Sequence, residues 1–140
     1  MARSRRLSQT LVVRVRCVRF FKSVGPGYGE PVEEHPRLRI GEEYVVLSVL
    51  VCDWIWRVGL QLLDRDDGWG WYPAGMFETV SPAIPSNWVT QLDSEGSLHL
   101  APRAWLEQPG FYEGYINGER NGPAAREIFE RERAVILDEA

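Results

Sequence analysis

Residues 41–80 read GEEYVVLSVLVCDWIWRVGLQLLDRDDGWGWYPAGMFETV, and this stretch decides the fold. Tyr44 to Val51 are mostly β-branched or aromatic, which favours a strand over a helix of this length. From Trp54 to Leu62 every second residue is apolar, so these side chains share one face of a strand. Asp67-Gly68 suits a tight turn, because both residue types tolerate positive φ. The stretch is therefore predicted to form a meander of three or four antiparallel strands.

The period-two spacing also predicts the core. We expect six side chains to be mostly buried in one β layer or barrel: Tyr44, Val46, Leu60, Leu62, Trp71 and Phe77.

Further elements are expected on both sides of the meander. Leu11 to Phe21 is a predicted strand with Val13, Val15 and Cys17 on one face. After the proline-containing connector 81–85, the sequence predicts a hairpin over 88–100, one or two helical turns over 102–108, and a terminal helix starting near Pro123.

The domain organisation follows from these elements. Residues 1–9 are polar and basic and are expected to be a disordered tail. Residues 10–140 are predicted to be a single β-rich domain, with a small, partly open barrel over about 11–80 and an appended hairpin and α-helix over about 81–140. The predicted fold class is mainly β.

Charge is distributed unevenly along the chain. Residues 1–22 hold seven of the sixteen basic groups and no acid, which leaves nine basic and twenty acidic groups in the other 118 residues, a net charge of −11. An acidic body repels phosphates, so no nucleic-acid partner is expected. It suits a partner protein with a basic surface.

Compartment is indicated by the cysteines and by hydropathy. Cys17 and Cys52 are the only cysteines, and each lies in an apolar, strand-like run. We expect both to be free thiols in a reducing environment. Arginines interrupt the apolar segment that an export signal would need, and no run is long enough to span a membrane. A cytoplasmic location without membrane association is predicted.

Motifs for catalysis and metal binding are weak. The two histidines, His35 and His99, are far apart in sequence and have no neighbouring Cys or His, whereas zinc sites use three or four closely spaced ligands. No Gly-x-Ser-x-Gly motif occurs, and neither cysteine has a nucleophile signature. We therefore predict no enzymatic activity, no metal and no cofactor.

The candidate binding residues are aromatic and acidic side chains near two turns of the meander. Trp54 lies near a hairpin tip, and three aspartates cluster in the next turn. Exposed tryptophans ringed by acids are typical of interface anchors. For Trp56, Trp69 and Trp71 the expected role is packing in or beside the core, with Trp69 kept as a binding candidate, and the aspartates can simply shape the turn. The predicted partner-binding set is Trp54, Trp69, Asp64, Asp66 and Asp67.

Two resemblances extend this reading. The order of Gly41–Leu47, Leu60–Gly68, Trp71–Pro73 and Phe77–Val80 resembles a small bacterial barrel of the Src-homology-3-like type. In addition, residues 84–89 (IPSNWV) resemble the proline-asparagine-aromatic motif of eukaryotic Src-homology-3 domains, which implies a peptide groove at Pro85 and Trp88. Trp88 stands where those domains have Tyr, and a hairpin and helix follow where they end.

The chain as a whole resembles small immunity proteins of bacterial polymorphic-toxin systems. The similar parts are Leu98–Trp105, Gly110–Glu113 and Phe129–Glu132. This resemblance implies a binding protein that neutralises a cognate toxin domain by occluding it. The alternative is a general peptide- or protein-binding barrel module of a bacterial or phage assembly; the sequence does not indicate the oligomeric state.

Overall fold

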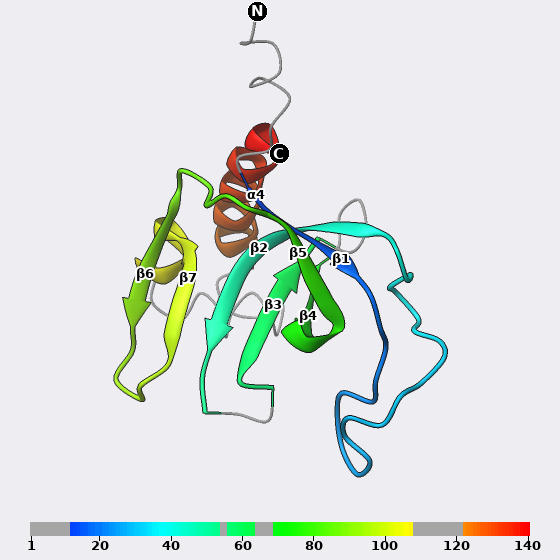
Figure 1. Ribbon diagram of the computed structural model, residues 1–140. Helices are drawn as coiled ribbons and strands as arrows, with labels where there is room; N and C mark the ends of the chain where they lie inside the picture. Colours follow the sequence, from blue (N-terminus) through cyan, green and yellow to red (C-terminus); the bar gives the residue numbers. More distant parts are fainter. Residues whose placement is uncertain (1–11, 54–55, 64–68, 108–121) are drawn as a thin grey trace, which may run out of the picture.

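Figure 1 shows a computed structural model of the chain, which describes residues 12–53, 56–63, 69–107 and 122–140. The protein is mainly β, with an antiparallel sheet and a C-terminal helix. The elements in chain order are β1 (Val13–Cys17), β2 (Glu43–Val51), β3 (Val58–Leu62), β4 (Gly70–Pro73), the 3-10 turn η1 (Ala74–Met76), β5 (Phe77–Pro82), β6 (Trp88–Leu92), β7 (Leu98–Pro102), α2 (Arg103–Glu107) and α4 (Gly122–Glu139).

Strand β2 organises the sheet. Along the main path the order is β4-β3-β2-β1-β5, and the hairpin β6–β7 joins through β7. The first part of β2 pairs with β1 (Tyr44 opposite Val15), whereas its end pairs with β7 (Val49 opposite Leu100). Its other side pairs with β3, with a register shift between Val46 and Ser48. The hairpin therefore joins β2 beyond the point where β1 begins.

The sheet is curled but is not closed into a barrel. β4 and β5 lie at opposite edges of the five-strand path, yet only Ala74–Met76 join them. Three residues span roughly 10 Å, because an extended chain covers about 3.3–3.6 Å per residue. The two edges must therefore curl toward each other, and the inside of this curl holds much of the core.

The predicted core is mostly correct. Tyr44, Val46, Leu60 and Leu62 are buried. Phe77 is only partly buried and packs against the core. Trp71 is also partly buried within the sheet, but it is not part of the core cluster. The reason is local: it borders an open pocket described below.

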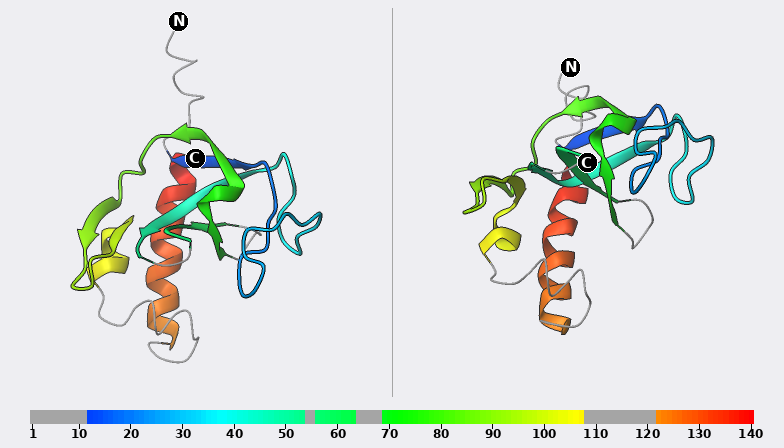
Figure 2. Two further views of the ribbon diagram at one scale, coloured as in Figure 1. Left: turned by 60° about the horizontal axis from the view of Figure 1, so that its bottom comes forward. Right: turned by 90° about the horizontal axis from the view of Figure 1, so that it is seen from below.

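Helix α4 covers one face of the sheet (Figure 2). Its buried Phe129 stacks on Trp105 of α2, with ring centroids 4.9 Å apart and planes 10° apart. The connector before β6 is attached to the same helix, because Asn87 donates from Nδ2 to the backbone oxygen of Glu132 at 3.2 Å. Ser86 adds a bond from its backbone N–H to Glu139 Oε1 at 2.8 Å.

This attachment buries the proline-asparagine-aromatic segment. Pro85 is fully buried and Trp88 is 8% exposed. In the Src-homology-3 pattern the same two positions line an open groove, so the groove implied at Pro85 and Trp88 is not open here.

Two strand predictions were too long. β1 ends at Cys17, because the chain leaves the sheet there and returns only at Glu43. β3 begins at Val58 rather than Trp54, because Arg57 has the left-handed φ of 59°, which ends an extended strand. The hairpin, the short helix and the terminal helix match their predictions.

Candidate partner-binding surface

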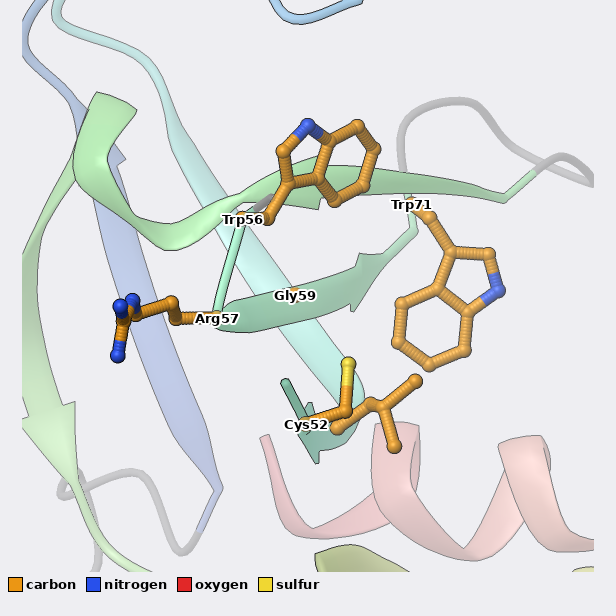
Figure 3. Close-up of a pocket in the computed structure, with 6 residues that line it drawn as sticks. Cys52, Trp56, Arg57, Gly59 and Trp71 are labelled. Carbon is orange, nitrogen blue, oxygen red and sulfur yellow. The ribbon is translucent and has the colours of Figure 1, made fainter. Parts of the chain in front are cut away.

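An apolar slot lies beside the β2–β3 connection. It has a volume of about 180 Å³, and Figure 3 shows the side chains around it. We call it the tryptophan slot; its lining residues are Leu50, Cys52, Trp56, Arg57, Gly59 and Trp71. β2 and β3 supply its floor, and β4 and the β2–β3 connection supply its two indole walls.

Gly59 creates the space between the walls. Its register partners are Leu50 on β2 and Pro73 on β4, so it lies in the middle of three paired strands. A Cβ atom at this position would lie 3.5 Å from Cε3 of Trp56 and 3.5 Å from Cε3 of Trp71. Any other residue would therefore place its side chain between the two indoles.

The Trp56 wall is held from outside the hairpin. Its indole Nε1 donates to the backbone oxygen of Ser23 at 2.7 Å. The backbone turns sharply here, since Val58 N–H donates to the Trp56 oxygen at 2.5 Å and Arg57 has positive φ. The Cys52 N–H donates to the backbone oxygen of Arg57 at 2.9 Å and so closes the β2–β3 connection. These contacts fix the first wall of the slot before any ligand arrives.

Arg57 is the charged residue at the slot. Its side chain is exposed, and Figure 3 shows its guanidinium group pointing away from Trp71. Among the described residues no ion pair or side-chain hydrogen bond engages it. The slot thus combines an apolar interior with a cation on its rim.

The segment between β1 and β2, residues 18–42, forms an excursion that supports this surface. Phe21 forms an isolated β-bridge with Pro31 inside the excursion. Its ring packs against Gly75 of η1, where an added Cβ would lie 3.4 Å from the ring. His35 lies between the rings of Phe20 and Tyr72, with centroids 5.6 Å from each. The excursion also supplies the Ser23 oxygen that anchors Trp56.

The excursion exposes charged groups of both signs and some aliphatic side chains. Glu30, Glu33 and Glu34 are exposed, and Val24 and Val32 are 63% and 40% exposed. Arg37 and Arg39 are exposed in the same segment.

The predicted binding residues have different outcomes. Trp54, Asp64, Asp66 and Asp67 lie outside the described residues. Trp69 is half-buried and packs against the core, with its ring centroid 6.0 Å from that of Phe129. Of the predicted set, the structure therefore places only Trp69, and it lies against α4 rather than at the slot.

Sequence reasoning missed Trp56, Trp71 and Gly59 as a group. Trp56 and Trp71 had been placed with the core because large aromatic side chains are usually buried. One pattern could have identified the slot: a glycine within a strand, where it packs nothing and marks close approach of other groups. The register that brings Trp71 beside it could not be read from the sequence.

A polar cluster, separate from the tryptophan slot, lies in the β6–β7 hairpin. Asp93 accepts bonds from the backbone N–H groups of Glu95 and Ser97, both at 2.9 Å, and contacts His99 Nε2 at 3.1 Å. The Ser97 N–H and then the His99 ring lower the pKa of the Asp93 carboxyl below its usual 3.8. Both oxygens of Asp93 serve the turn, so this pair shapes the hairpin.

The thiols differ in environment. Cys17 is fully buried and Cys52 is partly exposed in the slot; both are free. Burial raises the pKa of the Cys17 thiol. Within the described ranges, no three His, Cys, Asp or Glu side chains are grouped to hold a metal ion.

Comparisons with known proteins add no identity. No protein-family model matches the chain, and neither curated proteins nor solved structures give a significant match. In the part of the chain that the structure describes, no helix has both the length and the apolar character needed to cross a membrane.

Proposed function

We propose that this protein binds a toxin domain and neutralises it by occluding its active site or substrate groove, as immunity proteins do. One observation carries the proposal: an open apolar slot with two tryptophan walls beside the β2–β3 connection. Tryptophans at the surface are costly to leave in water and are enriched among the residues that dominate binding energy.

The slot suits an anchor side chain. Interface anchors are aromatic or aliphatic groups that fill a pocket near the centre of a contact, and truncating them costs about 2 kcal/mol or more. Trp56 is fixed by Ser23 and Gly59 leaves the opening, so little ordering is needed on binding. Preorganisation of this kind raises affinity because less conformational freedom is lost.

The excursion carries three exposed glutamates along with exposed Arg37 and Arg39. Glu30, Glu33 and Glu34 would attract a basic toxin surface and speed its association, an effect that salt screens. The aspartates at 64, 66 and 67 remain part of this proposal through their sequence. A protein acting only by occlusion needs no catalytic group, which agrees with the prediction of a non-enzymatic, cytoplasmic protein.

The Src-homology-3-like barrel type also belongs to the proposal. Its support is the three-residue link between β4 and β5 across a curled sheet. The alternative function, a general peptide- or protein-binding module of a bacterial or phage assembly, would use the same slot on a partner that is not toxic.

The test begins with capture of the partner. The full chain is tagged in its native host, the bound protein is identified by mass spectrometry, and that protein is expressed alone in cells that lack the chain. Growth arrest that is relieved by co-expressing the wild-type chain supports the proposal. A captured partner that causes no growth defect favours the assembly module, and absence of any stoichiometric partner overturns both.

Occlusion is then tested at the slot. Trp71→Ala removes one wall and should abolish growth rescue, whereas Val80→Ala, which truncates an exposed apolar residue on β5, should retain it. Equal rescue by both variants would move the binding surface away from the slot.

A further inference from the structure

We propose that the tryptophan slot accepts a phenylalanine side chain of the partner, and that a carboxylate next to this residue in the partner chain pairs with Arg57. This inference rests on the proposed function and deepens it, because it specifies the chemistry of the segment that the slot recognises.

Volume limits the group that enters. An apolar cavity of about 150 Å³ is known to hold one benzene molecule. The slot, at about 180 Å³, therefore has room for one six-membered ring with its linking methylene.

The lining selects an apolar ring over a hydroxylated one. Leu50, Trp56, Gly59 and Trp71 present carbon atoms, and Cys52 is a weak hydrogen-bonding group. A buried hydroxyl without a partner carries a desolvation penalty. Phenylalanine is thus favoured over tyrosine, and its ring can contact the two indoles with the offset or edge geometry that aromatic groups prefer.

The rim selects the charge beside the ring. Among the described residues, no carboxylate lines the slot, and Arg57 is the charged side chain at its edge. Asp53 is exposed in the same connection, but no ion pair joins it to Arg57 among the described residues. A cationic ligand would meet Arg57 without compensation, whereas a carboxylate can take bidentate bonds from the guanidinium group.

Backbone geometry separates the two recognition elements. Arg57 is the one non-glycine residue with positive φ in the described chain, a conformation that arginine rarely adopts. It directs the Trp56 ring and the Arg57 side chain to different sides, as Figure 3 shows. A ligand therefore needs its ring and its carboxylate on separate side chains, which two neighbouring residues provide.

The test uses four capped dipeptides on the full chain, followed by two-dimensional amide NMR. The probes are N-acetyl-Phe-Glu-amide, N-acetyl-Phe-Gln-amide, N-acetyl-Phe-Lys-amide and N-acetyl-Ala-Glu-amide. We expect Phe-Glu to shift the amides of Cys52, Gly59 and Trp71 and to bind about threefold more tightly than Phe-Gln, a ratio typical of an exposed ion pair. Phe-Lys should bind more weakly than Phe-Gln, and Ala-Glu should leave these amides unshifted.

Variants of the chain test whether Arg57 is the group that recognises the carboxylate. Arg57→Asn keeps a residue that tolerates positive φ but removes the charge, so Phe-Glu and Phe-Gln should bind equally. Arg126→Gln removes the charge of an exposed residue on α4, so the ratio of Phe-Glu to Phe-Gln affinity should be preserved. Salt at 0.5 M should shrink the ratio toward one, because screening weakens exposed pairs.

Several results would overturn the inference. These are equal binding of Phe-Glu and Phe-Gln, tighter binding of Phe-Lys, or no shift of slot amides with any Phe probe. If the probes fail while Trp71→Ala still loses growth rescue, the slot is an anchor site for another group and the proposed function stands. If the probes succeed but the partner is not toxic, only the proposed function fails.

Discussion

Trp56 and Trp71 flank Gly59 so closely that a methyl group on Gly59 would touch Cε3 of each indole at 3.5 Å. These distances are ordinary van der Waals contacts, and Gly59 does not have a positive φ. Alanine can therefore occupy this position without strain while narrowing the slot. Gly59→Ala therefore tests the space within the slot without a large change in the stability of the strands around it.

Core stability is tested at Leu62. This side chain is fully buried in β3, opposite Val46. Leu62→Ala should lower the free energy of unfolding by about 2–5 kcal/mol, because it removes buried methyl groups and leaves a cavity. Leu92→Ala, at a position that is 69% exposed, should change it by less than about 0.5 kcal/mol. Urea denaturation measures both, and similar losses would contradict the core assignment.

Acid sensitivity is predicted for the β6–β7 hairpin. The folded pKa of Asp93 lies below its unfolded value, because the Ser97 N–H and the His99 ring favour the carboxylate. Its contribution to stability is therefore complete above about pH 4, near the unfolded pKa, and is lost as the pH falls through the folded pKa. Urea unfolding between pH 6 and pH 2 should show this loss.

Asp93→Asn is the matched variant for that experiment. It cannot ionise, so its stability should vary less with pH below about 4 than that of the wild type. Glu95→Gln, in the same turn, should retain the wild-type dependence. Identical acid profiles for wild type and Asp93→Asn would contradict the prediction.

The two thiols should react at different rates. N-ethylmaleimide should label Cys52 in the native protein, because this side chain is partly exposed at the slot. Cys17 is buried with a raised thiol pKa, so it has little thiolate at pH 7 and should react only on unfolding. Mass spectrometry should find one label on the folded chain and two on the unreduced, unfolded chain. Failure to label either residue after unfolding would indicate a disulfide.

Sequence patterns predicted the local elements well. The β-branched run of β2, the alternation in β3 and the start of α4 follow from composition and periodicity, which act over a few residues. The long-range pairings could not be predicted, because β1 pairs with both β2 and β5 and the end of β2 pairs with β7. Such pairings depend on the folded arrangement as a whole.

The candidate site also depends on the folded arrangement of the chain. The left-handed Arg57, the Ser23 contact and the β3–β4 register each place one part of the slot. None is encoded within a short window, so composition alone directed attention to Trp54 and Trp69. The general expectation of an aromatic surface near the hairpin end stays a prediction for Trp54.

The most direct measurement of the central claim is calorimetric titration of the purified partner into two alanine variants. Gly59→Ala adds a methyl between the slot indoles, and Gly75→Ala adds one 3.4 Å from the Phe21 ring, outside the slot. Both should fold with stability close to the wild type. We expect Gly59→Ala to weaken binding about tenfold, or about 1.4 kcal/mol, and Gly75→Ala to change it less than about twofold. Equal, unchanged affinities for both variants would show that the partner does not use the slot.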